Sequence, residues 1–578
     1  MFGELEITGN VEFQGDIYET DEIIRYVQII KFKFIEKKLQ KGKDVIGIVL
    51  RRSQYMISVM LAALESNIAF INIELNMPYD RIEYMIKDSG IKYLVVMEDI
   101  GSEFAHYDKI FLNDIENYSF KDKKIGGEES YSNYEIDFEN IAYIIYTSGT
   151  SGKPKGVEIK RKGIYNLIQG VCNLIPFRKK SRIASFTNST FDIFILETIL
   201  AMYAGLIVVM ADDNQKDNPK KIVELILKQK IDILQMTPSR LKLIKLIDKE
   251  WDCLKNLSQI LIGGEQFPEE LLPEINKATT ATIYNMYGPT ETTVWSSICN
   301  VSESEYVHLG TPIRNTRLYI LNEKKLPISN KEDFGEIYIA GDGLARGYLN
   351  NPNLTEKSFC KLKCEPFECI YRTGDLGRYD ENGNIKCLGR IDEQVKVRGF
   401  RIELSEIDVN IEKIDEVKSS ITCFIEEEEI LINFYVSDKN VDIRTQIKNF
   451  LPSYMLPALY YRVDNVLFTA SGKTDRKAML KKYYEQSNLN IFIKNDDEIE
   501  KRVFEIISKS IQSDAAISLE NKFYELGIDS LKFVSLIVNL EMEFNIEFSD
   551  DKLVNSAFNN VGNLIFYIKE LVSTKVGI

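Results

Sequence analysis

Residues 146–156, YTSGTSGKPKG, combine glycines, hydroxyl side chains and two lysines directly after the apolar run 141–145. Glycines let a backbone approach a ligand closely, hydroxyl and amide groups donate to anionic oxygens, and lysines supply positive charge. The composition predicts a flexible loop that leaves a buried strand and cradles phosphate groups. It is not a Walker loop, because no glycine lies five residues after Gly149 or Gly152. Taken alone, the segment is equally consistent with a surface hairpin turn.

Length and composition describe a globular chain with several domains. The 578 residues are 44% hydrophobic and 28% charged, which is typical of soluble proteins and sufficient for about four domains. The net charge of −15 argues against a nucleic-acid-binding surface. The longest uncharged apolar run, residues 198–211, spans 14 residues, whereas a membrane helix needs about 20. We therefore expect neither a nucleic-acid partner nor a membrane span.

Cysteine and histidine usage argues against two classes of site. Eight cysteines form no CxxC pair, and the only cluster, Cys360, Cys364 and Cys369, has no histidine near it. Reduced thiols in a cytoplasmic protein are therefore expected, and the N-terminus shows no secretion signal. The only histidines, His106 and His308, lie in no motif, which argues against a histidine-based hydrolase or a histidine-ligated metal.

The elements that must position the loop alternate between helix and strand. This alternation, on both sides of the loop, predicts layered α/β sheets. Short alternating strands with turns follow over about residues 318–390, then a smaller α+β unit, and finally three helical patterns from about residue 498. The expected helices are residues 19–39, 55–64 and 162–175, and the expected strands are 45–50, 70–73, 91–96 and 182–186.

Eight motifs occur in order along the chain and together indicate a family. They are YTSGTSGKPKG, FDIFILE, NMYGPTETT, GEIYIAGDGLARGY, YRTGDLGRY, GRIDEQVKVRGFRIEL, LPSYMLP and ASGKTDRK. In this order the chain resembles the adenylation domain of nonribosomal peptide synthetases, within the adenylate-forming ligase superfamily. The resemblance covers nearly the whole chain, and a domain that resembles peptidyl and acyl carrier proteins follows.

The resemblance implies a multidomain α/β fold. A large N-terminal adenylation subdomain, with layered α/β sheets and a β-rich subdomain, would precede a small mobile α+β C-terminal subdomain and an all-α helical-bundle carrier domain. The expected bounds are residues 1–391 for the large subdomain, 392–484 for the small one, 485–497 for a linker and 498–578 for the carrier domain.

The implied reaction is attack of a carboxylate oxygen on the α-phosphate of ATP, with pyrophosphate leaving. Such a transition state needs positioning and charge neutralisation. In the family's pattern, Lys473 would stabilise the negative charge shared by the substrate carboxylate and the α-phosphate. Thr290 would donate to the α-phosphate, and Glu291 would hold Mg²⁺. Asp392 matches the hinge about which the C-terminal subdomain would rotate to withdraw Lys473 and present the carrier arm.

The remaining nucleotide contacts follow from the same resemblance. Because other residues contact adenine, ribose and α-phosphate, the opening loop is expected to hold the phosphates that leave, as a mobile lid that is poorly ordered without ATP. The expected contacts are Asn285 and Tyr287 at adenine, Asp375 at the ribose, Arg390 near ribose and phosphate, and Thr147, Ser148, Thr150, Ser151 and Lys155 at the β- and γ-phosphates.

Asp192 in FDIFILE matches the family's partner for an α-amino group. A buried carboxylate beside an ammonium group forms a charge-assisted pair, which favours amino acids over plain acyl or aryl acids. The pocket pattern resembles the family's glycine type, and its large side chains could fill the space of a substrate side chain. The expected pocket residues are Asp192, Ile193, Leu196, Gln235, Leu261, Gly263, Met286, Val294 and Trp295, with Lys473 at the carboxylate end.

Glycine is therefore the expected substrate, and three alternatives stay open. The first is an alanine or D-alanine carrier-protein ligase. The second is an acyl- or aryl-acid adenylating ligase fused to a carrier, against which Asp192 argues. The third is a catalytically silent scaffold that only presents a carrier domain.

Ser530 in ELGIDSL resembles the phosphopantetheine attachment site of carrier proteins, and a phosphodiester there would lie at a helix N-terminus. The implied cofactors are ATP, Mg²⁺ and 4′-phosphopantetheine covalently bound to Ser530. The implied partners are a phosphopantetheinyl transferase and a downstream condensing or transferring enzyme in trans, because the chain resembles a free-standing loading module. A requirement for an MbtH-like protein stays open.

Two single positions and one residue pair depart from the family's pattern. Ile528 stands where peptidyl carriers usually have a second glycine, and Ser66-Asn67 replaces an alanine-glycine pair. Cys387 stands where an aromatic residue is common. None of these changes removes a catalytic group, although Cys387 puts one packing contact beside the nucleotide in doubt.

Overall fold

In the computed structural model, the chain divides into two compact units. The first unit contains residues 1–147, 154–241 and 250–393, and the second contains residues 148–153, 242–249 and 394–578. Each unit is considered by itself. The structure describes residues 5–118, 137–304, 306–328, 333–361, 369–397, 399–426, 429–467, 474–487, 498–511, 517–519, 521–528, 530–544, 546, 548, 552, 558 and 560–576.

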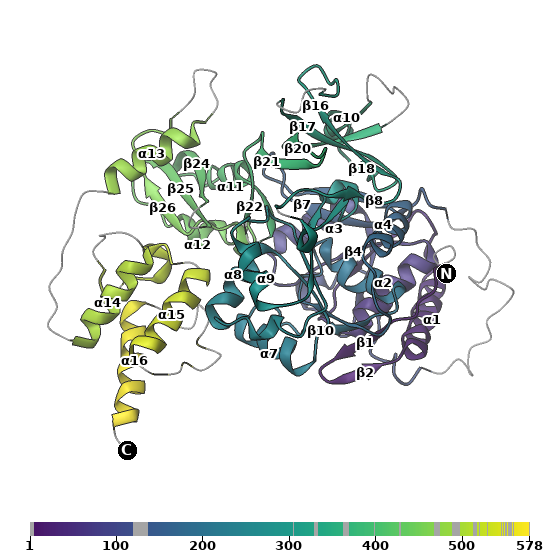
Figure 1. Cartoon of the computed structure of the whole chain (residues 1–578), viewed down its shortest axis with the longest axis horizontal. Coiled ribbons are helices and arrows are strands. Elements are labelled where there is room, and N and C mark those ends of the chain that lie inside the picture. The colour runs from purple at the N-terminus through teal and green to yellow at the C-terminus, as the bar shows by residue number, and fades with distance from the viewer. Residues whose placement is uncertain are drawn as a thin grey trace. The chain divides into compact units, whose positions relative to one another are not determined.

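A seven-stranded sheet forms one layer of the first unit, in the order β18-β8-β7-β4-β3-β5-β6. Its central strands pair in parallel and are rich in buried apolar residues, as expected for a sheet covered by helices. Helix α2 contacts β4, and α4 contacts β7 and β8 (Figure 1). The strands are β3 (Val45–Ile48), β4 (Ala69–Asn72), β5 (Ile91–Val96), β6 (Lys109–Phe111), β7 (Ile141–Thr147), β8 (Lys155–Lys160) and β18 (Gly347–Tyr348), and the helices are α1 (Thr20–Glu36), α2 (Gln54–Ser66), α3 (Tyr79–Ser89) and α4 (Arg161–Leu174).

The end of α2 accounts for one departure from the family's pattern. Asn67 caps this helix in the left-handed conformation, with φ 57°. Glycine is the usual residue at such a position, and asparagine is the side chain that best tolerates it. The chain therefore keeps the turn into β4 without the glycine.

A nine-stranded sheet forms the second layer, in the order β15-β14-β13-β12-β11-β9-β10-β1-β2. The segment α5-η4-α6 contacts both β9 of this sheet and α2, and its side chains join one continuous hydrophobic core. The strands are β1 (Asn10–Phe13), β2 (Asp16–Tyr18), β9 (Arg182–Ser185), β10 (Ile207–Met210), β11 (Ile233–Met236), β12 (Gln259–Gly263), β13 (Thr282–Tyr287), β14 (Ser297–Asn300) and β15 (Thr311–Pro312), and the helices are α5 (Ile193–Ile195), the π-helix η4 (Leu196–Leu200), α6 (Ala201–Tyr203), α7 (Pro219–Lys228), α8 (Pro238–Ile247) and α9 (Leu271–Ala278).

The β-rich region expected near residues 318–390 is a five-stranded antiparallel sheet. Its order is β16-β17-β20-β19, and β21 pairs with β20. The strands are β16 (Thr316–Leu321), β17 (Gly335–Gly341), β19 (Phe359–Lys361), β20 (Cys369–Tyr379) and β21 (Ile385–Arg390), and helix α10 (Pro352–Ser358) precedes β19.

The second unit contains a small α+β part and a helical part. A three-stranded sheet β24-β25-β26 and the hairpin β22-β23 build the first, and a separate apolar core joins the helices of the second. The elements are β22 (Gln394–Val397), β23 (Phe400–Glu403), α11 (Leu404–Ile411), β24 (Val417–Ile425), β25 (Ile430–Ser437), α12 (Ile443–Ile447), β26 (Leu459–Arg462), α13 (Arg476–Ser487), α14 (Glu498–Ile511), η9 (Phe523–Leu526), α15 (Ser530–Phe544) and α16 (Val561–Val576).

The sequence-based expectations about membrane spans and cysteines can be compared with the described residues. Within the described part of the chain, no helix has the length and apolar character needed to cross a membrane. None of the seven cysteines that the structure describes forms a disulfide bond with another described cysteine. The exact subdomain bounds stay predictions, and most of the expected linker lies outside the described residues.

Candidate active site

Asp375, Tyr287 and Arg390 form a hydrogen-bonded cluster in the first unit. Asp375 of β20 lies opposite Arg390 of β21 in the strand register. The Tyr287 hydroxyl donates to Oδ2 of Asp375 at 2.7 Å, and Arg390 Nη1 donates to Oδ1 at 2.6 Å. Burial, and secondarily the Asp375 carboxylate, raises the pKa of Tyr287 well above its usual value, so the phenol keeps its proton. The carboxylate retains lone pairs that could accept hydrogen bonds from ribose hydroxyls.

The same guanidinium also holds the predicted hinge residue. Arg390 donates from Nε and Nη2 to the two carboxylate oxygens of Asp392, at 2.7 and 2.8 Å. Gly374 makes this close approach possible: its φ is +78°, and a Cβ there would lie 2.6 Å from Arg390 Nη2 and 2.9 Å from Asp392 Oδ2. Arg390 therefore links Asp375, the carboxylate predicted to bind the ribose, to Asp392, the carboxylate predicted to lie at the hinge.

Asn285, the second predicted adenine contact, is oriented by His308. The side-chain amide of Asn285 donates to the His308 carbonyl at 2.8 Å, which leaves its Oδ1 to accept from an exocyclic amino group. The His308 ring in turn accepts from the Gly310 amide through Nδ1 at 3.0 Å and contacts Cys299 Sγ at 3.2 Å. Burial lowers the pKa of His308. His308 thus has a supporting role in the part of the chain expected to bind adenine.

Glu291, the predicted Mg²⁺ ligand, lies fully buried in the short 3₁₀ turn η6 (Thr290–Thr292). The Tyr348 hydroxyl donates to its Oε1 at 2.7 Å, and the Lys155 ammonium lies 5.0 Å from the Tyr348 ring centroid. In the described residues no group of three His, Cys, Asp or Glu side chains could hold a metal. A Mg²⁺ ion here would therefore take further ligands from phosphate and water, as Mg²⁺ sites in nucleotide enzymes usually do.

The turn after Glu291 has a strained backbone. Thr293 and Val294 both have positive φ, 62° and 64°, and β-branched residues rarely adopt this conformation. Thr293 Oγ1 donates to the Gly343 carbonyl at 2.6 Å, which helps to hold the turn. A Cβ at Gly288 would lie 2.5 Å from the Val294 carbonyl oxygen, so only glycine fits beneath the turn. The strained turn directs the chain into Trp295.

Four of the predicted pocket residues share one face of the nine-stranded sheet. Gln235 of β11 pairs with Leu261 of β12, and Gly263 of β12 pairs with Met286 of β13. Because side chains alternate along a strand, Leu261 and Gly263 point to the same side. The Trp295 ring covers this face, since a Cβ at Gly263 would lie 2.5 Å from the ring. The structure therefore brings these predicted pocket residues together.

The described pocket residues are buried, except Asp192 and Ile193, which are half-buried. Two donors among the buried ones have no hydrogen-bond partner within the described chain. These donors are Gln235 Nε2 and Trp295 Nε1. Asp192 precedes α5, and Ile193 and Leu196 follow it on α5 and η4. Side-chain exposure is 0% for Leu196 and Leu261, 1% for Val294 and Trp295, and 2% for Gln235 and Met286.

A polar network holds the segment carrying Asp192, and of its residues only Glu197 belongs to a motif. Arg52 donates to the backbone carbonyls of Thr187, Ser185 and Ala211 at 2.5 to 2.7 Å. The Glu197 carboxylate accepts from the backbone and hydroxyl of Thr187 at 3.0 and 2.6 Å. No local pattern in the sequence indicates Arg52, because all of its partners lie more than 130 positions away.

The opening loop is shorter than expected and belongs to the second unit. Strand β7 continues to Thr147 and β8 begins at Lys155, because these two residues pair across an antiparallel hairpin. Ser148 donates to the Arg401 carbonyl at 2.8 Å and accepts from the Glu403 amide at 3.0 Å. The predicted phosphate ligands Thr150 and Ser151 are exposed. These contacts hold the loop in the structure, and its order without ATP stays a prediction.

A carboxylate takes the place expected for phosphate at this loop. The Gly149 amide donates to Oε2 of Glu406 at 2.8 Å, and Asn410 Nδ2 donates to the Gly152 carbonyl at 3.2 Å. Gly152 has φ +77°, and a Cβ there would lie 2.5 Å from Val409 Cγ1. The contacts from α11 therefore compete with an anionic ligand for the Gly149 amide.

We expect Glu406→Gln to lower the KM for ATP in pyrophosphate exchange about fivefold. Glutamine can still accept from Gly149 but without the charge that strengthens the bond, and this difference is about 1 kcal/mol. ATP then displaces a weaker competitor. Exchange rates at varied ATP measure the effect, with Asn410→Ala as a control that removes a loop contact and no charge. An unchanged or higher KM in Glu406→Gln would contradict competition at this loop.

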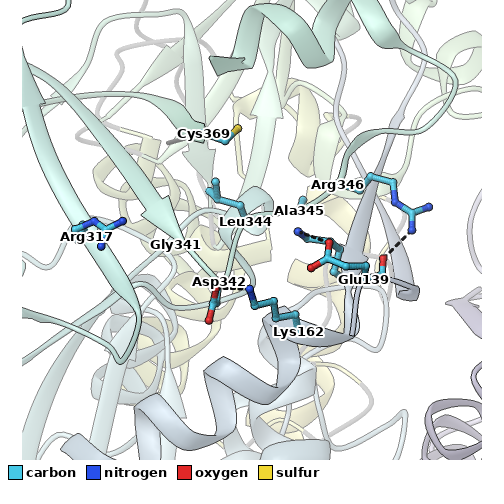
Figure 2. Close-up of a pocket in the computed structure, with 10 residues that line it drawn as sticks. Glu139, Lys162, Arg317, Gly341, Asp342, Leu344, Ala345, Arg346 and Cys369 are labelled. Atoms are coloured by element: carbon cyan, nitrogen blue, oxygen red, sulfur yellow. Dashed lines mark hydrogen bonds and ion pairs between the residues drawn. The ribbon is translucent and has the colours of Figure 1, made fainter. Parts of the chain in front are cut away.

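A separate cavity of about 910 Å³ lies in the first unit, and none of the predicted site residues lines it. Figure 2 shows Lys162 directed at Asp342, and the two form an ion pair at 2.7 Å. Arg346 donates to the Glu139 carbonyl at 2.8 Å, and Lys160 pairs with the Glu139 carboxylate at 3.2 Å. Its lining carries four cationic side chains and two carboxylates, and it stays separate from the predicted nucleotide contacts.

Two residues with predicted roles in the reaction, Lys473 and Ser530, are described only in part or not at all by the structure. Lys473 falls outside the described residues, so its role stays a prediction. Ser530 is the first residue of α15, the position that the attachment-site motif predicts. Its side chain is not among those described.

Comparison with known proteins decides the family. The AMP-binding enzyme model matches residues 34–349, which include the loop, Asp192, Glu291 and every expected pocket residue except Lys473. The chain belongs to the family of AMP-binding enzymes. A second model, phosphopantetheine attachment site, matches residues 501–568 and thus covers Ser530. The chain is therefore an adenylation domain followed by a carrier domain, as the motifs predict, and it uses ATP, Mg²⁺ and 4′-phosphopantetheine.

Curated relatives of this AMP-binding enzyme are nonribosomal peptide synthetases. It is 31% identical over 90% of its length to bacitracin synthase 3 of Bacillus licheniformis, and 32% identical over 88% to tyrocidine synthase 3 of Brevibacillus parabrevis. It spans only 8% of the length of each.

Solved structures agree with this domain order. An NRPS protein containing adenylation and PCP domains, in its holo form with a vinylsulfonamide inhibitor, matches with TM-score 0.81 and 20% identity, covering 98% of this chain and 95% of that one. A holo four-domain nonribosomal peptide synthetase bound to AMP and glycine matches with TM-score 0.58 and 26% identity, covering 98% of this chain and 42% of that one.

Proposed function

We propose that this enzyme activates glycine as glycyl-AMP and passes the glycyl group to its own carrier domain. The observation that carries the proposal is the pocket beside Asp192, where Trp295 lies against Gly263 and Leu196, Leu261 and Met286 are fully or almost fully buried. An indole in this position leaves little room for a substrate side chain. Steric exclusion of this kind discriminates strongly, whereas a roomy pocket rejects glycine by only about 1–3 kcal/mol per methylene.

The charge at the pocket supports an amino acid over a plain acid. Asp192 is half-buried at the start of α5, next to Ile193, which packs against the apolar core. A carboxylate there gains from an ammonium partner. The match to a synthetase bound to AMP and glycine, at 26% identity, is consistent with this choice.

The proposed chemistry has two balanced steps. A substrate carboxylate oxygen bonds to the α-phosphorus of ATP while the bond to the β-phosphate oxygen breaks, and pyrophosphate leaves. In the second step the glycyl carbonyl carbon would exchange its bond to the phosphate oxygen of AMP for a bond to sulfur, AMP would leave, and the thiol proton would pass to solvent. Ser530 would hold the phosphopantetheine group that supplies this thiol. Asp375, Arg390 and Tyr287 would hold the nucleotide, and Glu291 would hold Mg²⁺ against the phosphates.

Several partners belong to this proposal. A phosphopantetheinyl transferase would modify Ser530, and a downstream condensing or transferring enzyme would take the glycyl group. The identity of that acceptor and a requirement for an MbtH-like protein stay open, and a cytoplasmic location stays a prediction.

ATP–pyrophosphate exchange across a panel of amino acids tests the substrate. We expect the highest kcat/KM with glycine, and a loss of at least about 30-fold in Asp192→Asn, because removing one partner of a buried charge pair costs about 2–5 kcal/mol. Asparagine keeps the size of the side chain, so the variant isolates the charge. Intact mass after incubation with a phosphopantetheinyl transferase, ATP and glycine reports loading, and Ser530→Ala gives the unloaded baseline.

The outcomes separate the alternatives. Turnover highest with D-alanine or L-alanine would assign the chain to the alanine-activating class. Full activity of Asp192→Asn would contradict the proposed contact between Asp192 and the substrate ammonium group. A preference for an aryl or acyl acid would contradict it as well. Holo-carrier without a glycyl mass increment in the wild type would overturn the proposed function.

A further inference from the structure

Tyr143 is a buried tyrosine in the middle of β7 that no motif assigns to the site. Its side chain is 1% exposed, and its hydroxyl has no hydrogen-bond partner in the described structure. More than nine-tenths of buried polar groups in proteins are paired. A partnerless phenol in the core of the first unit therefore needs a physical explanation.

Strand register places this hydroxyl on the face that carries the segment of Asp192. Tyr143 lies beside Phe70 in the parallel pair β4–β7, and their ring centroids are 5.8 Å apart. Asn72, two residues after Phe70, shares that face because side chains alternate along the strand. Its Nδ2 donates to the carbonyl of Ser189 at 2.8 Å. The face with Phe70, Asn72 and Tyr143 thus lies against the chain that leads into Asp192.

The electrostatics of Tyr143 agree with this placement. Burial raises its pKa well above the usual value, and the nearby carboxylate of Asp192 raises it further. The phenol therefore remains neutral and keeps an oxygen that can accept a hydrogen bond. Tyr143 also belongs to the same apolar cluster as the pocket side chains Leu196, Met286 and Trp295.

We propose that Tyr143 is a further substrate-binding residue, whose hydroxyl oxygen accepts a hydrogen bond from the α-ammonium group of the amino acid beside Asp192. This inference rests on the proposed function. An ammonium group has three N–H donors, and a carboxylate on one side does not satisfy all of them in a buried pocket. The Tyr143 hydroxyl supplies another acceptor, and the ammonium supplies the partner that this hydroxyl lacks.

Calorimetric binding to two adenylate analogues tests the contact on the full chain. One ligand is glycyl-sulfamoyl adenosine, and the other is its acetyl counterpart, which lacks the amine. We expect Tyr143→Phe to weaken binding of the glycyl ligand about tenfold and to leave binding of the acetyl ligand within twofold. Because both ligands are measured on one preparation, their affinity ratio does not depend on the active fraction.

Tyr107→Phe is the matched control. The Tyr107 hydroxyl is also buried without a hydrogen-bond partner among the described residues, but it precedes β6, the edge strand separated from β7 by three others. We expect this variant to bind both ligands as the wild type does. We also expect Tyr143→Phe to melt no lower than the wild type, since it removes a hydroxyl that bonds nothing in the free protein.

Three results would overturn the inference. One is an unchanged ratio of glycyl to acetyl affinity in Tyr143→Phe, and another is equal weakening of both ligands. The third is a variant that melts lower or does not fold, because the hydroxyl then supports the structure itself. Failure of the proposed function would give a different result from failure of this inference. The wild type itself would then show no preference for the glycyl over the acetyl ligand.

Discussion

Asp375→Ala is expected to lower kcat/KM for ATP in pyrophosphate exchange about 100-fold. Its carboxylate accepts from Tyr287 and Arg390 and, in the predicted role, also from two ribose hydroxyls. Hydrogen bonds to a charged group contribute about 1.5–3 kcal/mol each. The loss of about 3 kcal/mol corresponds to about 100-fold at 1.36 kcal/mol per tenfold. The KM for glycine should change little, because the pocket lies on other strands.

The control for this prediction is Asp380→Ala in the same β-rich sheet. Asp380 accepts from the Asn382 and Asn384 amides, both at 2.8 Å, in the turn between β20 and β21. This variant also removes a hydrogen-bonded carboxylate, but none of the predicted nucleotide contacts. It should keep the wild-type KM for ATP. An Asp375→Ala enzyme within threefold of the wild type, at an unchanged melting temperature, would contradict the ribose assignment.

Trp295→Ala is expected to move specificity from glycine toward larger amino acids. The indole lies against Gly263, where even a single added Cβ would lie 2.5 Å from its ring. Removing it opens space beside Met286 and Leu261. We expect kcat/KM for glycine to fall at least tenfold and activity with alanine or leucine to rise. The exchange panel measures both changes in one experiment.

Trp251→Ala is the matched control, because the chain has only two tryptophans. Trp251 is 2% exposed, close to the 1% of Trp295, and lies next to the 3₁₀ turn η5 (Asp252–Leu254). Truncating a buried tryptophan typically costs about 3–5 kcal/mol of stability, so both variants should melt lower. Only Trp295→Ala should change substrate preference. A variant that loses stability but keeps glycine preference would show that Trp295 packs the core without setting specificity.

Much of the layered fold is predictable from local patterns. The expected strand at residues 91–96 is β5 as observed, and the expected helix at residues 162–175 differs from α4 by one residue at each end. Both segments have periodic apolar residues on elements that the core covers, so periodicity and burial agree. The loop bounds were less predictable, because cross-strand pairing of Thr147 with Lys155 depends on a partner strand.

The proximity of the pocket residues on the strands was predictable to a similar extent, and their role in binding stays a prediction. Motif order assigned Gln235, Leu261, Gly263 and Met286 to one pocket, and the register of β11, β12 and β13 places them side by side. The supporting residues were not assigned. Tyr348 donates to Glu291 and is the final tyrosine of the GEIYIAGDGLARGY motif. Membership of that motif was the sequence signal that could have indicated a supporting role for Tyr348.

By itself the sequence determined the family, the domain order and the identity of the residues expected to do chemistry, because each motif keeps its residue types within a short stretch. Only the tertiary structure decided their partners. Arg52 with Thr187, Glu406 with Gly149, and Tyr143 on the face beside Asp192 all join positions far apart in the chain. Strand order, register and packing determine such contacts, and local spacing carries no information about them.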